Sequence, residues 1–212
     1  ERTIIGAVGD ERVFRPNELE RLPDVERVVR VLNDWKIISR EADEEDSRIV
    51  IRGVIFGGAK RLDITADTDR VQKADAVFVD PFYLPSRPYE KVDEQRENSR
   101  VRAIVQEISD LQKTGKPVIV RIRDVRQIDE ALSAGADILY LGGSMMTNRT
   151  LLDEVGRLNT PVVLCKDKHH RVDDWLVAAE HIALRGNSHI MLGEAGTLSF
   201  EPEHAYRLDV DA

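Results

Sequence analysis

The sequence predicts an α/β protein, namely an incomplete (β/α) barrel of about six parallel strands that follows a small α+β segment. Short apolar runs bounded by Gly, Pro and Asn alternate with segments of helical period over residues 60–198. These runs are apolar throughout, which is typical of parallel strands buried on both faces. A closed barrel of this kind has eight strands. The chain provides six after Lys60 and is therefore two short.

The opening segment differs in pattern from the rest, and Gly57-Gly58 marks its end. We therefore expect two domains, over residues 1–58 and 59–212. The expected elements of the first domain are strands over Thr3–Val8, Trp35–Ser39 and Ile49–Ile55, a helical turn over Asn17–Leu22 and a short helix capped by Asp24 over Val25–Leu32. The acidic run Glu41–Ser47 is expected to be a solvated connection.

Strands and helices are expected to alternate through the second domain. The expected strands are Leu62–Thr65, Ala76–Asp80, Pro117–Ile122, Asp137–Leu141, Pro161–Leu164 and His189–Leu192. The expected helices are Glu97–Lys113, Val125–Ser133, one that starts near Asn148, and Val172–Leu184. Three prolines within Pro81–Tyr89 exclude a helix or central strand there.

Composition bounds the class of protein. Of the 212 residues, 42% are hydrophobic and 33% are charged, and no apolar run approaches the roughly 20 residues of a membrane span. The formal charge of −8 argues against a general nucleic-acid binder. A single cysteine, Cys165, cannot form an internal disulfide, so we expect the protein to be located in the reducing cytoplasm. Because residue 1 is Glu rather than Met, we expect the natural chain to start earlier.

Chemistry in such folds sits beyond the C-terminal ends of the strands. The ligand-binding candidates there are Asp80, Arg87, Arg121, Arg123, Lys166 and Glu194. Arg121 and Arg123 flank Ile122, so both are expected on one side, as an anion site or as salt-bridge partners of Asp80 or Glu194. Asp80 and Glu194 are also a candidate acid–base pair, although nothing in the sequence sets their separation.

Two further features follow the strand that ends near Cys165. The thiol is either a nucleophile with His169 as its base or a small buried hydrophobe. His169 and His170 are weak metal-ligand candidates, because adjacent side chains point in different directions; a solvated loop is the alternative. No catalytic residue is assigned.

Several motifs carry a family resemblance over nearly the whole chain. ERTIIGAVGDER, LPDVERVVRV, MMTN…LLDEVG, TPVVLCK, DDWLVAAEHIALRGN and GEAGTLSFE occur in this order. The sequence resembles the class I synthases of 3-deoxy-arabino-heptulosonate 7-phosphate (DAHP synthases) and the related 3-deoxy-octulosonate 8-phosphate synthases. The resemblance implies a TIM-type barrel after a ferredoxin-like regulatory domain. It also implies condensation of phosphoenolpyruvate with an aldose phosphate, usually with a divalent metal.

Most positions that the resemblance implies for this reaction carry other residues here. It implies a Lys-Pro-Arg loop after the second strand, a Glu ending the third, an Arg after the fourth, a Lys-Arg pair after the fifth and an Arg after the sixth. The matching positions are Tyr83-Leu84-Pro85, Arg121, Ser144, Cys165-Lys166 and Ala195. Arg87 is nearby but lies two residues after Pro85, the position of the implied arginine in the Lys-Pro-Arg loop. Because Ser, Tyr, Ala and Pro cannot replace Arg or Lys as phosphate ligands, we expect the phosphate sites to be lost.

The implied metal site is also incomplete. Its first ligand, a Cys, falls near Thr68, and its other ligands belong to two strands that this chain does not contain. We therefore expect no cofactor.

Three functions remain open. The first is a catalytically inactive relative that serves as a binding, regulatory or assembly subunit. The second is a repurposed enzyme with a new site at the barrel mouth. The third is a DAHP synthase of which this chain is a fragment. Because open strand edges need cover, we expect a homo-oligomer or a protein partner. A small-molecule ligand is also possible in the first reading; no nucleic acid or membrane is expected.

Overall fold

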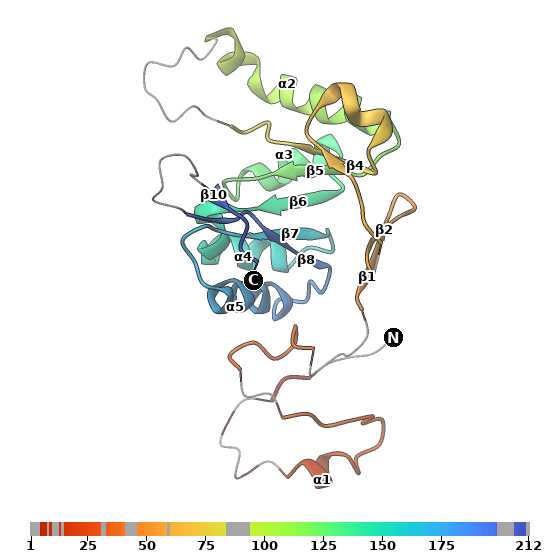
Figure 1. Cartoon of the computed structure of the whole chain (residues 1–212), viewed down its shortest axis with the longest axis vertical. Helices are drawn as coiled ribbons and strands as arrows, with labels where there is room; N and C mark the ends of the chain where they lie inside the picture. Colours follow the sequence, from red (N-terminus) through yellow and green to blue (C-terminus); the bar gives the residue numbers. More distant parts are fainter. Residues whose placement is uncertain are drawn as a thin grey trace. The chain divides into compact units, whose positions relative to one another are not determined.

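The structure, a computed structural model, describes residues 5–7, 9, 13, 15–30, 33–40, 46–58, 60–83, 94–198 and 206–210. The chain divides into two compact units, Glu1–Glu45 and Asp46–Ala212. The second unit holds the six-stranded sheet (Figure 1) and all the candidate site residues that the structure describes.

The first unit contains one short helix in its described part, α1 (Pro16–Leu19), at the expected helical turn. The helix expected over Val25–Leu32 is wrong where the structure describes it, because residues 25–30 are irregular. Asp24 has a left-handed φ of 67°, and the Val28 amide donates to the Glu20 carboxylate instead of a helical carbonyl. The strand expected over Trp35–Ser39 is also wrong, because a turn closes from Ser39 N–H to the Lys36 carbonyl. Of Thr3–Val8, residues 5–7 are described and form no strand; Glu41–Glu45 lie outside the described residues.

The second unit is built on the six-stranded parallel sheet that the sequence predicts. Its strands, in spatial and chain order, are β3 (Ile64–Thr65), β4 (Ala76–Val79), β5 (Val118–Arg121), β6 (Ile138–Leu141), β7 (Val162–Lys166) and β8 (Ile190–Glu194). All neighbours pair in parallel. The sheet curls into an incomplete TIM-type barrel, which confirms the expected fold class.

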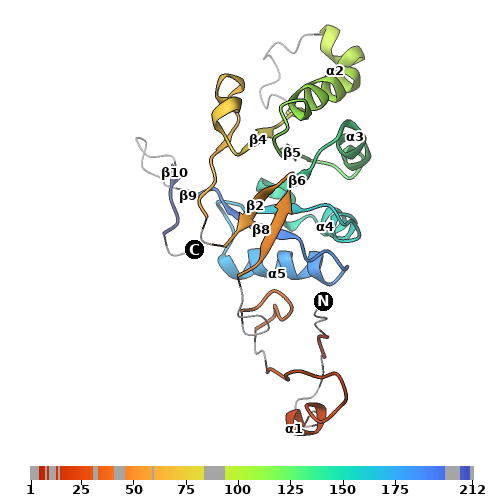
Figure 2. The same ribbon diagram turned by 90° about the vertical axis from the view of Figure 1, so that its right-hand side faces the viewer.

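Helices follow the strands along the chain and cover the outer face of the sheet. They are α2 (Glu94–Gln112), α3 (Gln127–Ala134), α4 (Arg149–Gly156) and α5 (Val172–Ala183). Two 3₁₀ helices, Thr68–Lys73 and Gly143–Thr147, lie between strands. Figure 2 shows α2 to α5 in an arc outside the strands. As predicted, the α4 helix begins after Asn148, whose side chain accepts from the Leu151 amide.

Side-chain alternation along the strands separates two faces of the curled sheet. In the central strands β5 to β7, residues toward the helices are fully buried; they include Val118, Val120, Leu139, Leu141, Val162 and Leu164. Residues on the concave face include Ala76, Phe78, Ile119, Tyr140 and Val163, which belong to one cluster. Positions that follow Ile119 and Val163 by two residues therefore face the interior of the barrel.

The segment Ile49–Ile55, expected as one strand, is instead an antiparallel hairpin. Strands β1 (Arg48–Ile51) and β2 (Val54–Gly57) pair around Arg52-Gly53. Both turn residues have positive φ, 49° and 79°, as a tight two-residue hairpin turn requires. Arg52 is held in this conformation by its Nε, which donates to both carboxylate oxygens of Asp137 at 2.8 Å.

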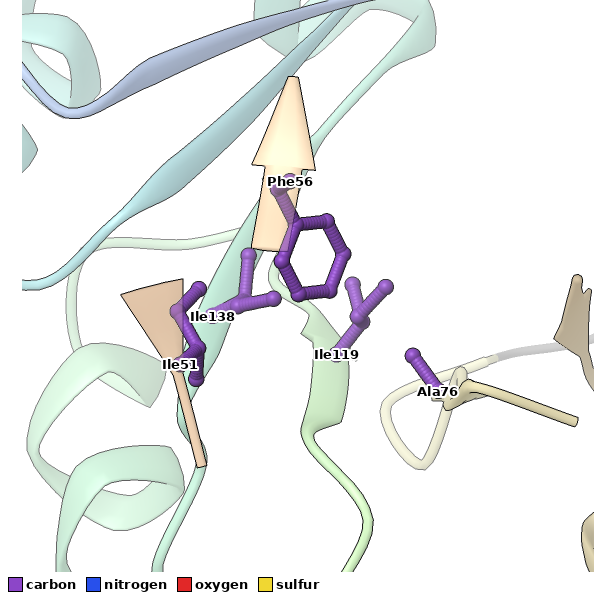
Figure 3. Close-up of a cluster of buried hydrophobic side chains, with 5 residues drawn as sticks. All are labelled: Ile51, Phe56, Ala76, Ile119 and Ile138. Carbon is purple, nitrogen blue, oxygen red and sulfur yellow. The ribbon is translucent and has the colours of Figure 1, made fainter. Parts of the chain in front are cut away.

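The hairpin packs on the concave face of the sheet. Figure 3 shows Ile51 and Phe56 from the hairpin beside Ala76, Ile119 and Ile138 from the sheet. The hairpin thus belongs to the second compact unit, which begins at Asp46 because these apolar side chains bury one another. The expected domain boundary at residue 58 stays a prediction.

A second small hairpin follows the sheet and was not predicted. Strands β9 (Thr197–Leu198) and β10 (Tyr206–Arg207) pair antiparallel. Gly196 has a φ of 86° and a side chain there would collide with the Arg207 carbonyl, so this crossing requires glycine. Within the described part of the chain, no helix is long and apolar enough to cross a membrane.

Replacing Phe56 by Ala tests the role of the first hairpin. Phe56 is 5% exposed, so its loss should leave a cavity and lower the free energy of unfolding by about 3 kcal/mol in urea titrations. Ile55 lies in the same strand but is 40% exposed, so Ile55→Ala should cost less than about 1 kcal/mol. Equal effects of the two variants would contradict the packing described here.

Candidate functional site

Ionisable and polar side chains gather at the C-terminal end of the sheet, which we call the mouth. Asp80 directly follows β4, Arg121 ends β5, Tyr140 lies in β6 and Cys165 in β7. Arg121 follows Ile119 by two residues and Cys165 follows Val163 by two, so both lie on the concave face. Four adjacent strands thus bring these groups to one place.

Asp80 lies close to two arginines, Arg121 at the end of β5 and Arg123 just after it. Arg123 donates to both oxygens of the Asp80 carboxylate. Arg121 Nη1 lies 3.6 Å from Asp80 Oδ2, beyond a hydrogen bond. The structure thus brings Asp80, Arg121 and Arg123 together, with two cations on one carboxylate.

The Arg121 guanidinium makes no hydrogen bond within the described part of the chain. Its Nε is buried without a partner, and its Cζ lies 5.6 Å from the centre of the Tyr140 ring. The side chain is 27% exposed. Arg123, in contrast, is occupied by Asp80 and lies over the Tyr83 ring at 5.7 Å. Arg121 therefore offers unused donors at the mouth.

Tyr140 shapes the mouth and was not predicted from the sequence. Its ring packs edge-on against Phe78, with centres 5.1 Å apart. A Cβ on Gly142 would lie 2.8 Å from this ring. The Gly142-Gly143 pair after the strand was therefore the feature of the sequence that could have indicated the position of the Tyr140 ring. Burial raises the pKa of the Tyr140 hydroxyl, which is therefore neutral at physiological pH.

Cys165 is buried, as expected if it is a small buried hydrophobe and not a nucleophile. It is 4% exposed, and burial raises the pKa of its thiol, to which the charge of Glu194 adds. The thiol donates to the Lys166 carbonyl at 3.9 Å. His169, weighed as its base, instead lies 3.6 Å from Asp167 and is 65% exposed. A largely protonated, enclosed thiol is a poor nucleophile.

Contrary to the prediction from the sequence, the Lys166 side chain does not reach the mouth. It shares its strand face with Val162 and Leu164, opposite Val163 and Cys165. The side chain is 1% exposed, and its Nζ lies 3.0 Å from Asp209 Oδ2, in the segment after β10. Glu194 on β8 is the register partner of Lys166. One oxygen of the Glu194 carboxylate accepts a hydrogen bond from the Gly196 amide. The other oxygen, Oε2, is buried without a described partner. The structure gives no contact between Asp80 and Glu194.

The histidine pair and the implied metal do not form a site in the described residues. His169 and His170 both lie near Asp167, His170 at 3.7 Å. No group of three or more His, Cys, Asp or Glu side chains that could hold a metal occurs where side chains are described. These residues do not fit the divalent metal of the resemblance. Arg87 lies outside the described residues.

An apolar hollow of about 320 Å³ opens on the concave face below the mouth. Its lining residues are Ile64, Ala66, Phe78, Ile119, Tyr140 and Val163. Tyr140 therefore belongs both to the hollow and to the surroundings of Arg121. The mouth combines an unsatisfied cation with an apolar recess.

Comparison with known proteins identifies the family to which this chain belongs. The model of the DAHP synthetase I family matches residues 90–212, more than half of the chain. The chain belongs to the DAHP synthetase I family. A second model, the DAHP synthase ferredoxin-like domain, matches residues 1–33 in the first unit. Both parts of the resemblance noted in the sequence are thereby confirmed.

Individual relatives agree with the family. The chain is 29% identical to phospho-2-dehydro-3-deoxyheptonate aldolase of Thermotoga maritima over 226 residues, which is all of this chain and 65% of that protein. The crystal structure of the Thermotoga maritima DAHP synthase aligns with a TM-score of 0.73 and 25% identity over 96% of this chain and 62% of that one. A truncated form of the Thermotoga maritima enzyme shares the fold, with a TM-score of 0.63 and 22% identity over 84% of this chain and 68% of that one. The chain thus spans about two thirds of the length of these relatives.

Replacing Asp209 by Asn tests the placement of Lys166. The ammonium group would stay buried without its carboxylate, so the free energy of unfolding should fall by about 3 kcal/mol. Asp63, in an exposed pair with Arg70, is the control: Asp63→Asn should cost less than about 1 kcal/mol.

Adding Lys166→Met to Asp209→Asn removes the unpaired buried charge. The double variant should therefore recover much of the lost free energy of unfolding, measured by chemical denaturation. Wild-type stability in Asp209→Asn alone would show that Lys166 is not held as described.

Proposed function

We propose that this chain is a DAHP synthetase family member that does not carry out the condensation and serves as a binding or regulatory subunit. The observation that carries the proposal is the position of Lys166. Of the cations that the resemblance implies after the fourth, fifth and sixth strands, Lys166 alone is retained, and it is buried against Asp209. Because the Lys166 side chain is 1% exposed, a phosphate could reach its ammonium group only if the surrounding groups moved.

The other implied phosphate positions support the same conclusion. Cys165 is a buried neutral thiol, while Ser144 and Ala195 are exposed and uncharged. Phosphate recognition depends on charge-assisted hydrogen bonds, each worth about 1.5–3 kcal/mol. Losing several of them together would remove useful affinity for a phosphorylated substrate.

The charge at the end of β5 is also reversed. The resemblance implies a glutamate there, and this chain has Arg121. Arg121 and Arg123 outnumber Asp80, so this part of the mouth has a net positive charge. A changed charge on an inherited scaffold fits a changed ligand better than a preserved reaction.

A partner is part of the proposal. The curled sheet ends at β3 on one side and β8 on the other, and strand edges of this kind pair readily with another chain. We propose that a second copy or a protein partner covers them. A buried, reduced Cys165 fits a cytoplasmic location.

A second candidate function is the condensation itself. The whole chain aligns with the Thermotoga maritima aldolase and spans 65% of it, so this chain could be part of an active synthase. The substrates would then be phosphoenolpyruvate and an aldose phosphate, as the resemblance implies.

A phosphate-release assay separates the two. Phosphoenolpyruvate, erythrose 4-phosphate and Mn²⁺ should yield no inorganic phosphate above the protein-free rate, because the phosphate ligands are replaced. The Thermotoga maritima enzyme, assayed alongside, provides the positive control. Steady release that scales with the concentration of this chain would overturn the proposal and establish the second candidate.

A further inference from the structure

We propose that Arg121 and the hollow beneath it bind a small monocarboxylic acid with an apolar body. This assigns a ligand class to the binding role proposed above and rests on it. The site is not the one that the resemblance implies, because that pattern has a glutamate, not a cation, at position 121.

The first step is the unused hydrogen-bonding capacity of Arg121. A guanidinium has five N–H donors, and a desolvated donor without an acceptor costs about 1–3 kcal/mol. Arg121 makes no hydrogen bond among the described residues, although its Nε is fully buried. Asp80 does not satisfy it, because the carboxylate is engaged by Arg123 and its Oδ2 lies 3.6 Å from Arg121 Nη1, beyond a hydrogen bond. An external acceptor would satisfy it.

The second step is the charge of the ligand. Within the group of Arg121, Arg123 and Asp80, two guanidinium groups and one carboxylate leave a charge of one positive unit. That charge matches a carboxylate, whose two oxygens fit the planar fork of an arginine. A phosphate monoester carries nearly two negative charges and would remain partly uncompensated. The local balance therefore favours a monocarboxylate.

The third step is the body of the ligand. The hollow of about 320 Å³ is at the lower end of the range for small-molecule sites, about 300–1,000 Å³. All of its lining side chains are apolar or aromatic, and Ile119 lies two residues before Arg121 on the same strand face. Tyr140 connects the recess with the guanidinium. A ring or short branched chain would fill the recess while its carboxylate reaches Arg121.

The fourth step is access from the mouth. A Cβ on Gly143 would lie 3.7 Å from Arg121 Nη2, at ordinary van der Waals distance, so position 143 lies beside the guanidinium. Gly143 has a φ of 61°, which favours glycine at this position. Because glycine has no side chain, position 143 places none over the guanidinium.

Benzoate is the probe, followed by ligand-observed NMR and calorimetry on the full chain. Arg121→Gln should weaken benzoate binding about tenfold to a hundredfold, the value of a charge-assisted pair. Arg126→Gln is the matched control, because Arg126 is 89% exposed and paired with Asp124; it should bind benzoate like the wild type. Benzamide, which lacks the charge, and inorganic phosphate should each bind at least about tenfold more weakly than benzoate.

Thermal unfolding of Arg121→Gln verifies that the variant is folded. In the wild type, benzoate should also shift the NMR signals of the Tyr140 ring, a readout that needs no variant. The proposal is overturned if Arg121→Gln binds benzoate like the wild type, if benzamide equals benzoate, if phosphate binds more tightly, or if benzoate does not bind up to its solubility. None of these results depends on phosphate release, so failure of this site and failure of the proposed function are distinguishable.

Discussion

The hydrogen-bonded parallel ladder from β3 to β8 decides which side chains can meet at the mouth. In each strand, alternate residues face the helices or the concave face, and the register fixes which neighbours share a level. Arg121 and Tyr140 therefore meet, while Lys166 turns away. One residue of slip in β7 would exchange Cys165 and Lys166 and reverse the electrostatics of the mouth. The hairpin β1–β2 supports this register by packing Ile51 and Phe56 against Ile119 and Ile138.

The electrostatics of the second unit follow from this division. The buried ammonium of Lys166 is neutralised by Asp209, a residue from the tail, so this cation is paired inside the second unit and is not exposed at the mouth. Arg121 is in the opposite situation, since it faces the mouth and lacks a full partner. Buried thiol and phenol groups beside it stay neutral because burial raises the pKa of Cys165 and of Tyr140. Arg121 thus has unused donors beside neutral thiol and phenol groups, while the charge of Glu194 also acts on the Cys165 thiol.

The sequence predicted the parallel sheet well because its signals are local and repeated. Apolar runs such as Val118–Val120 and the cap at Asn148 specify their own structures. The hairpin over residues 48–57 was missed because Arg52-Gly53 is a rarer turn pair than Asn-Gly, and the contact of Arg52 with Asp137 spans 85 residues. For the site, alternation placed Arg121 and Arg123 together. No local pattern could show that Asp209 would reach Lys166 or that Tyr140 would lie beside Arg121.

We propose that the mouth no longer recognises phosphate. Binding of phosphoenolpyruvate can be compared by calorimetry with binding of methacrylate, which keeps the carboxylate on a small alkene but has no phosphate. We predict that phosphoenolpyruvate binds no more tightly than methacrylate, with or without Mn²⁺, because Lys166 is paired with Asp209. Phosphoenolpyruvate binding that is tenfold or more tighter would contradict it, since about 1.4 kcal/mol would then come from phosphate contacts that this structure does not provide.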